Sequence, residues 1–160
     1  MRRAITDAVR TEPTNPLPDG TRTMWLCDAL LGALLLLAAA FGLAAGVGEL
    51  MPWLPLATAA GGLAYVVVVP RTRYRRWRWA LGEEELDLVH GVWTVTRTIV
   101  PITRIQHVSV ERTGWTDFFG LVRLHVHTAA GKTTIPGLER AQADDTRDRI
   151  LARLRTPDDL

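Results

Sequence analysis

Two long runs without a charged side chain, at residues 29–47 and 50–70, constrain this chain more than any other feature. The first run has 19 residues. At about 1.5 Å per residue such a helix is roughly 28 Å long, close to the ~30 Å hydrocarbon core of a bilayer. The second run has 21 residues, and Pro52 and Pro55 lie in its first turn, where proline costs a helix least. The runs predict a helical hairpin that crosses a membrane twice, with spans at about 26–47 and 51–70.

Two other structures could account for the first run. A secretory signal peptide has a shorter apolar centre near the N-terminus, followed by a cleavage site. Here the run begins about 28 residues into the chain, and a second run follows at once. A buried core helix is the other alternative, but a soluble protein of 160 residues could hardly bury both runs.

Arginines precede the first run and follow the second run, but none lies in the connection between them. The connection between the runs carries Glu49 and neither Lys nor Arg. Positively charged residues stay on the cytoplasmic side, so we expect a multi-pass inner-membrane protein with both termini cytoplasmic. Asp28 lies about one turn inside from Trp25; it is expected to reach the interface, and a buried functional carboxylate is the alternative. The flanking arginines are Arg2, Arg3, Arg10 and Arg22 before the first run, and Arg71, Arg73, Arg75, Arg76 and Arg78 after the second.

The segment VPRTRYRRWRW at residues 69–79 has three possible roles. A nucleic-acid site would need a docking element and a second basic face, and the net charge of the chain is only +2. A specific headgroup pocket is a second possibility. The third possibility is that the arginines set the membrane topology and bind anionic headgroups, each contributing about 1 kcal/mol near the surface. This role by itself is sufficient to explain the segment. The residues predicted to contact lipid are Arg71, Arg73, Arg75, Arg76, Trp77, Arg78 and Trp79, with Val69 and Pro70 closing the second span.

After Arg78 the hydrophobic pattern changes to the alternation of strands. Residues 85–88 place Leu86 and Leu88 on one face, and the His90-Gly91 pair predicts a turn. In the next strand the apolar face is predicted to be Trp93, Val95 and Ile99, interrupted by Arg97. Further strands are expected at 102–113, at 121–129 with Leu124 and Val126 inward, and at 132–138, ending at Pro136-Gly137.

A helix is predicted at the end of the chain, from Glu139 to Arg155, with Ala143, Arg147, Ile150 and Leu154 along one face. A small sheet with one apolar face must be covered, and this helix is the available cover. We therefore expect a cytoplasmic tail at 1–24, a transmembrane hairpin at 25–70 and a cytoplasmic domain at 74–160.

Motifs of enzyme chemistry are absent from the sequence. It contains no phosphate-binding glycine loop, no His-Glu-x-x-His, no nucleophile elbow and one cysteine, Cys27. His125 and His127 could hold a metal but are read as exposed strand residues. The carboxylates of EEELD at 83–87 do not converge on one point and are read as a solvated edge. No catalytic residue, cofactor, metal or small-molecule substrate is predicted.

The segment TGWTDFFG at residues 113–120 groups Trp115, Phe118 and Phe119 between two glycines. One interpretation is that these rings fill the open end of the domain. The other is that they contact the membrane surface or a partner protein, since exposed aromatic clusters usually mark contacts.

The order of these features, with the segment GVWTVTRTIVPITRIQHVSVERTGWTDFFGLVRLHVHTAAG, resembles the bacterial pleckstrin-homology-like membrane family, also called YdbS-like. The resemblance rests on Val100-Pro101, on Arg104-Ile105-Gln106-His107-Val108, on Phe119-Gly120-Leu121 and on the turn that ends at Gly131, and it covers about residues 25–155. It implies an α+β fold: a transmembrane hairpin, then a pleckstrin-homology-like antiparallel barrel or sheet with a C-terminal capping helix. It does not imply phosphoinositide binding.

These observations predict a non-catalytic scaffold or interaction module at the inner face of a bacterial membrane. Its expected partners are an anionic bilayer and other membrane proteins or further copies of itself, without nucleic acid. The family resemblance suggests a role in cell-envelope stress or homeostasis. The alternative is a lipid-headgroup-binding sensor that uses the basic exit segment and the loop at 113–120. A membrane enzyme would need a converging polar site, which the sequence does not offer.

Overall fold

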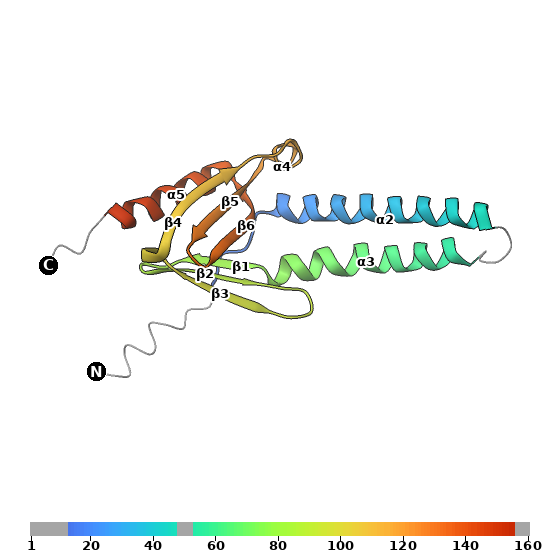
Figure 1. The fold of residues 1–160 in the computed structure, drawn as a ribbon, viewed down its shortest axis with the longest axis horizontal. Helices are drawn as coiled ribbons and strands as arrows, with labels where there is room; N and C mark the ends of the chain where they lie inside the picture. The colour runs from blue at the N-terminus through green and yellow to red at the C-terminus, as the bar shows by residue number, and fades with distance from the viewer. Residues whose placement is uncertain (1–12, 48–52, 156–160) are drawn as a thin grey trace.

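A computed structural model describes residues 13–47 and 53–155 of the chain. Two long helices lie side by side, and a domain of two small sheets with a covering helix sits at one end of them (Figure 1). The elements are α2 (Asp19–Val47), α3 (Leu54–Arg76), β1 (Arg78–Leu81), β2 (Glu85–His90), β3 (Thr96–Pro101), the 3-10 turn η2 (Ile102–Arg104), β4 (Ile105–Glu111), α4 (Gly114–Phe118), β5 (Leu121–Thr128), β6 (Gly131–Glu139) and α5 (Arg140–Arg155).

Helices α2 and α3, called the apolar pair below, present hydrophobic side chains around most of their circumference. Both are long and apolar enough to cross a membrane. Leu34, Leu35 and Leu36 follow one another along α2 and are each more than 60% exposed. Three consecutive leucines point in different directions from a helix, so α2 has no polar face to turn toward water. This distribution is that of a helix surrounded by lipid.

Helix α3 continues past Pro70, where the second span is predicted to close, and ends at Arg76. Proline lacks an N–H and removes the bond to the carbonyl of residue i−4, here Val66. The helix tolerates this loss, and three arginines in its last turn, Arg73, Arg75 and Arg76, favour the negative end of its dipole. Most of the basic exit segment is therefore helical.

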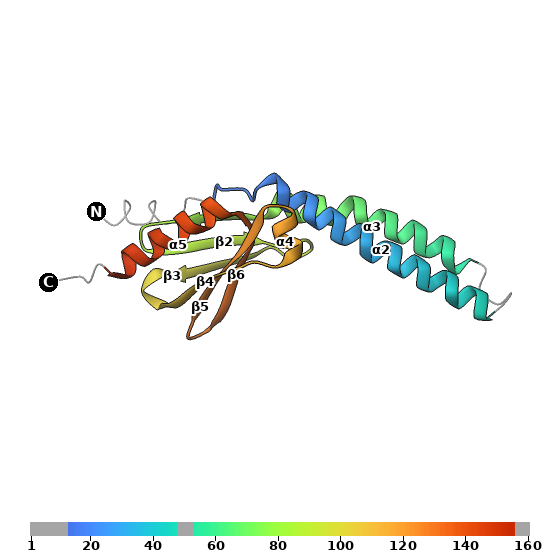
Figure 2. The same cartoon turned by 90° about the horizontal axis from the view of Figure 1, so that it is seen from above.

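The six strands form two antiparallel three-stranded sheets, ordered β1-β2-β3 and β4-β5-β6, and not a closed barrel. Their inner faces share one hydrophobic core, with Leu86, Leu88, Leu124 and Ile135 all 0–1% exposed. Helix α5 covers this core through Ala143 and Ile150, both fully buried, and Figure 2 shows it lying along the strands. Leu154, predicted on the same face, is 36% exposed. The α+β fold class expected from the sequence is confirmed.

Strand β3 faces the opposite way from the prediction. Val100 is 6% exposed and faces the core, whereas Ile99 and Val95 are about half exposed and Trp93 is 88% exposed. Arg97 lies on the outer face, where it forms a two-pronged ion pair with Asp87 of β2 at 2.6 Å. Arg97, which interrupts the apolar residues Trp93, Val95 and Ile99, indicates that these residues lie on the outer face of the sheet and not in the core.

Strand β6 passes through Pro136 and Gly137 instead of ending there. The register shifts at this point, so that β6 carries an extra residue opposite β5, and β6 is an edge strand, where proline is tolerated. The irregularity brings Gly137 against α2, whose Thr21 hydroxyl donates a hydrogen bond to the Gly137 carbonyl at 3.1 Å. A β-carbon at Gly137 would lie 2.4 Å from the Thr21 hydroxyl oxygen. Glycine is needed here because the Thr21 side chain packs directly against the Gly137 backbone.

We predict that Gly137→Ala destabilises the protein by about 1–3 kcal/mol, the usual cost of inserting a methyl group into a packed site. Denaturant unfolding of the full chain in detergent micelles would measure this loss. Gly114→Ala is the matched control, since a β-carbon at Gly114 meets nothing within 4 Å. Equal stability of the two variants would show that the Thr21 contact is unimportant.

Candidate functional site: the junction between the apolar pair and the sheets

The start of the apolar pair is built into the sheet domain, meaning the six strands with α4 and α5. Asn15 exchanges two backbone hydrogen bonds with Trp79 of β1, at 3.0 and 3.1 Å. Leu17 and Met24 are 1–2% exposed and belong to the core of the domain. The Tyr74 hydroxyl of α3 lies 2.8 Å from the Leu17 carbonyl. Residues 13–24, expected to be part of a tail, thus tie α2, α3 and β1 together.

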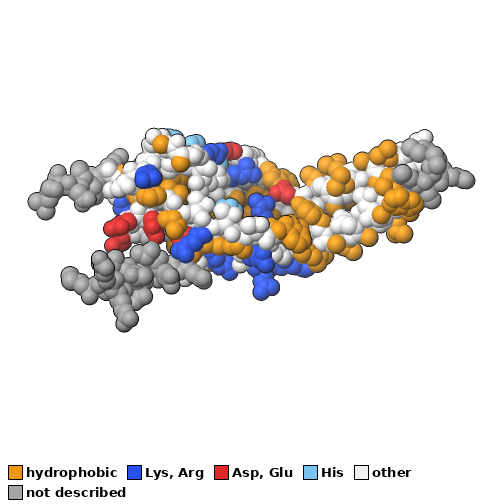
Figure 3. Space-filling view, turned by 60° about the horizontal axis from the view of Figure 1, so that its bottom comes forward, with side chains coloured by type: hydrophobic (Ala, Val, Ile, Leu, Met, Phe, Trp, Pro, Cys, Tyr) orange, Lys and Arg blue, Asp and Glu red, His pale blue; other side chains and the backbone are white. Residues whose placement is uncertain are grey.

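The arginines predicted to contact lipid fall into two groups. Arg71, Arg73, Arg75 and Arg76 are all exposed on α3. Among the described residues, however, Arg71 and Arg75 make no hydrogen bond or ion pair with the sheet domain, and Arg71 donates only to the Val67 carbonyl of its own helix. Figure 3 shows Lys and Arg side chains gathered where the hydrophobic surface of the pair meets the domain. Arg76, Arg78 and Arg73 are held in place. Arg76 donates to the carbonyl of Val92, Arg78 donates to the carbonyls of Tyr74 and Trp77, and the Arg73 guanidinium carbon lies 4.1 Å from the centre of the Trp25 ring.

Trp77 and Trp79 lie in the hydrophobic core, at 4% and 5% exposure. Trp77 also stacks on His90, with the ring centres 5.9 Å apart. This burial is at odds with the predicted lipid contact. The two tryptophans alternate with arginines because strand β1 begins here, so that Trp77 and Trp79 point inward and Arg78 outward.

The segment at 113–120 forms the short helix α4, which is held at both ends. Thr113 and Thr116 cap its start reciprocally, and Asp117 lies 3.5 Å from both Arg112 and Arg140. Phe119 packs against the core, which agrees with the interpretation that the aromatic rings of this segment fill the open end of the domain. Trp115 and Phe118 do not fill the domain in this way, because they are 42% and 79% exposed. Their rings are stacked, with the ring centres 6.4 Å apart.

The α4 segment is attached to the apolar pair by one side-chain hydrogen bond. The indole nitrogen of Trp115 donates to Oδ1 of Asp28 on α2 at 2.7 Å. Asp28 lies on the stretch expected to be within the first span, so the two exposed rings of α4 lie beside the beginning of that stretch. Sequence reasoning placed Asp28 at the interface but could not find its partner, which is 87 residues away.

The domain carries two exposed aromatic groups, called the aromatic tips below: Trp115 and Phe118 on α4, and Trp93 in the turn between β2 and β3. The second tip was not predicted from the sequence. Gly91 has φ of 141°, and a β-carbon there would collide with the Thr94 carbonyl, so the turn requires glycine. Trp93 projects from this turn, and Arg76 fixes the turn to the end of α3 through Val92. Figure 1 shows α4 on the side of α2 and the β2–β3 turn on the side of α3, both at the end of the domain nearest the pair.

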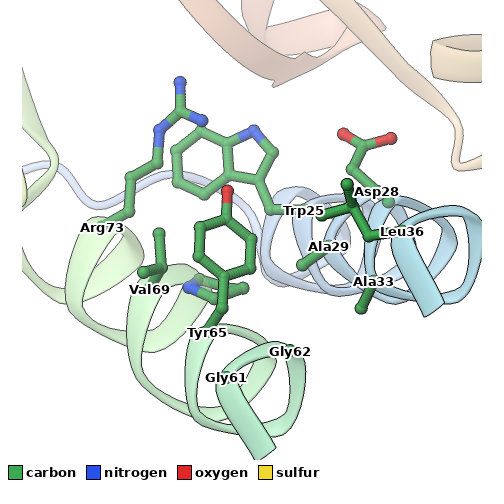
Figure 4. A pocket seen from close by; sticks show the side chains of 12 residues that line it. Trp25, Asp28, Ala29, Ala33, Leu36, Gly61, Gly62, Tyr65, Val69 and Arg73 are labelled. Carbon is green, nitrogen blue, oxygen red and sulfur yellow. The ribbon is translucent and has the colours of Figure 1, made fainter. Parts of the chain in front are cut away.

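A groove of about 390 Å³ separates α2 and α3 at the same level. Small residues form its floor, and the Trp25 indole, the Asp28 carboxylate, the Tyr65 ring and the Arg73 guanidinium stand around one end of it (Figure 4). The helices approach closely at Gly62, where a β-carbon would lie 3.3 Å from that of Ala33. The lining residues are Trp25, Asp28, Ala29, Gly32, Ala33, Leu36, Gly61, Gly62, Tyr65, Val69, Pro70 and Arg73.

His125, predicted to be an exposed strand residue, is 5% exposed. Its ring nitrogens lie 2.6 Å from a Glu111 carboxylate oxygen and 2.8 Å from the Thr134 hydroxyl. The hydrogen bond from His125 holds the pKa of Glu111 below its usual range. Among residues 13–47 and 53–155 there is no group of three or more His, Cys, Asp or Glu side chains suited to a metal ion. His125 therefore has a structural role, in which its ring links β5 to Glu111 of β4 and to Thr134 of β6.

Comparison with known proteins identifies the fold. The family model described as a bacterial PH domain matches residues 29–154, which include most of the apolar pair and all six strands. The chain belongs to the bacterial PH domain family. It is also 31% identical over 157 residues to the UPF0699 transmembrane protein YdbS of Bacillus subtilis, covering 94% of this chain and 99% of that protein. The YdbS-like resemblance predicted from the sequence is confirmed.

One solved structure is similar to this bacterial PH domain protein. It is the crystal structure of a DUF1696 family protein with a pleckstrin-homology domain from Shewanella loihica. The identity is 19%, the TM-score is 0.41, and the match covers 51% of this chain and 74% of the other. Family membership and the transmembrane relative together make the chain a membrane-associated PH-like module.

We predict that both aromatic tips are shielded from water when the protein is in a bilayer. An environment-sensitive NBD dye on a cysteine at Phe118 or Trp93, in a chain carrying Cys27→Ser, should fluoresce at shorter wavelength and resist quenching by iodide. Gln106 is the control position, since it is exposed on β4. Quenching at positions 93 and 118 equal to that at 106 would contradict membrane contact.

Proposed function

We propose that this protein is a non-catalytic interaction module of the bacterial inner membrane, serving cell-envelope homeostasis, in which a PH-like domain is fixed at a defined angle on the cytoplasmic leaflet. The observation that carries the proposal is the shared core: Leu17, Met24 and Trp25 pack into the same cluster as Trp77 and Trp79. A domain that only needed to stay near the membrane could hang on a flexible linker. Here the connection is buried, so the angle of the domain is set by packing.

A fixed angle determines which surfaces of the domain face the bilayer and which face the cytoplasm. Both aromatic tips lie at the end nearest the apolar pair, together with the exposed Arg71 and Arg75. The opposite end, with the start of β4 and the β5–β6 turn, points away from the pair (Figure 1). This far end is the part of the domain available to protein partners, which include other membrane proteins and further copies of the chain.

The non-catalytic part of the proposal rests on the chemistry of the described polar residues. Carboxylates and histidines that approach one another do so as bonded pairs, such as Arg97 with Asp87 and His125 with Glu111. Both pairs join neighbouring strands, Arg97 of β3 with Asp87 of β2 and His125 of β5 with Glu111 of β4. Family membership points the same way, since the match is to a PH domain and not to an enzyme.

The test is photocrosslinking in intact cells. A benzoylphenylalanine residue at Gln106 or at Ala129, both exposed on the far end of the domain, should give discrete adducts with one or a few proteins. The matched control is the same residue at Leu35, which lies on the outer surface of α2 and should capture mainly lipid. Lack of any protein adduct at both far-end positions would overturn the interaction-module proposal.

The orientation has its own test. A cysteine at position 49, in the Cys27→Ser chain, should react with a membrane-impermeant maleimide added to intact cells, because the loop between the spans is expected outside. A cysteine at Gln106 should react only after lysis. The reverse labelling pattern would refute the cytoplasmic placement of the domain.

A lipid-headgroup-binding sensor is the second candidate function. The bond from Trp115 to Asp28 favours it, since that bond holds an exposed aromatic surface beside the start of the apolar pair. In this alternative, the exposed arginines supply a general attraction to anionic headgroups, and α4 responds to the packing of the lipids it touches.

A further inference from the structure

We infer that the groove between α2 and α3 is a binding site for one glycerophospholipid with a phosphoethanolamine headgroup. The inference rests on the proposed placement of the apolar pair in a bilayer, and goes beyond it by giving the site a ligand class. The groove has about 390 Å³, within the range of roughly 300–1,000 Å³ typical of ligand pockets.

The position of the groove along the pair matches one leaflet. It extends from Trp25 to Leu36 on α2 and from Arg73 back to Gly61 on α3. At 1.5 Å per residue the α2 wall is about 16 Å long, roughly half of the ~30 Å hydrocarbon core. The polar residues lie at the end next to the sheet domain, and the small apolar residues line the rest. A lipid lying in the groove would therefore have its headgroup beside the domain and one acyl chain along the helices.

The floor of the groove has room for an acyl chain because it is made of glycine and alanine. A β-carbon added at Gly32 or Gly61 would meet nothing within 4 Å. These glycines therefore do not serve close packing between the two helices, unlike Gly62. An empty apolar groove would forfeit contacts along its walls, which a hydrocarbon chain restores.

Two opposite charges at the mouth of the groove specify the headgroup. Arg73, on α3, stacks on the Trp25 ring; the neighbouring Asp28 carboxylate, on α2, influences its guanidinium electrostatically. Figure 4 shows Arg73 and Asp28 on either side of Trp25, with the Tyr65 hydroxyl pointing toward the indole. Within the described part of the chain Arg73 has no carboxylate at ion-pair distance, so its N–H groups are available to a phosphate.

The carboxylate favours a zwitterionic headgroup over an anionic one. Oδ1 of Asp28 accepts a hydrogen bond from the Trp115 indole, and Oδ2 accepts none from the described residues. A primary ammonium group can donate to this carboxylate while the adjacent phosphate binds Arg73. An anionic glycerol headgroup would bring no positive charge to Asp28, and a choline headgroup has no N–H to donate. The scattered arginines attract an anionic surface, whereas this site selects an amine.

Native mass spectrometry of the full chain tests the inference. The protein would be delipidated in detergent, supplied with phosphatidylethanolamine, phosphatidylglycerol or phosphatidylcholine of matched acyl chains, and scored for retained lipid. We expect one phosphatidylethanolamine per chain, and at least tenfold weaker retention after Arg73→Gln or Asp28→Asn, because each loses a charged hydrogen bond. Asp28→Asn keeps an acceptor for Trp115, so the attachment of α4 is preserved.

Matched controls separate the site from general effects. Arg71→Gln removes an exposed arginine of the same helix outside the groove, and should leave retention unchanged. Gly61→Leu should fill the groove and abolish retention, whereas Gly42→Leu, equally free of neighbours but outside the groove, should not. Unchanged cooperative unfolding of each variant would show that it folds.

Three results would overturn the inference: equal retention of phosphatidylglycerol, no effect of Asp28→Asn, or retention of none of the three lipids. The photocrosslinking test of the proposed function reads protein adducts at the far end of the domain and does not depend on this groove. A negative result there with positive lipid retention, or the reverse, would tell the two proposals apart.

Discussion

One continuous hydrophobic core joins the apolar pair to the sheets, and the rest of the structure depends on it. Leu17, just before α2, and Met24, near the beginning of α2, are buried as completely as the centre of the sheets. Full burial of a side chain of this kind contributes about 1.5–3 kcal/mol. The hydrogen bonds at the same place, from Thr21 to Gly137 and from Tyr74 to Leu17, orient the contact more than they strengthen it. Together they make the helices and the PH-like domain one mechanical unit.

This union explains why the polar and aromatic features of the junction lie where they do. Because the end of α3 runs directly into β1, Arg76 is able to hold the β2–β3 turn, and Trp77 enters the core one residue later. Because α2 starts inside the domain, Asp28 reaches the Trp115 indole. Each apolar helix thus carries one aromatic tip of the domain beside it. A domain on a flexible linker could not position either tip relative to the helices.

The sequence was informative wherever one physical requirement dominated. Two uncharged runs have few alternatives to a pair of apolar helices, and the pattern of Ala143 and Ile150 has few alternatives to a covering helix. Alternation failed at β3, since an apolar residue such as Trp93 can face either a core or a lipid surface, and the pattern does not distinguish them. The lipid contact predicted for Trp77 and Trp79 was wrong for the converse reason. Tryptophan beside arginine is typical of a membrane interface, but here a strand begins and both rings lie in the core. Pro136 was read as the end of a strand, although an edge strand tolerates proline. The groove is formed between residues 25 or more positions apart in the sequence, so it could not be found from local pattern.

The hydrogen bond between Thr21 and Gly137 joins residues 116 positions apart. It follows that the order of synthesis matters for this chain. The segment that begins α2 leaves the ribosome first, but its buried position is completed only when β6, near the end of the chain, has been made. For a free chain, closing so long a loop is slow and entropically costly. Insertion of the two apolar helices before the sheets are complete would hold the early residues beside the place where the late strand forms, so the bilayer would shorten the search.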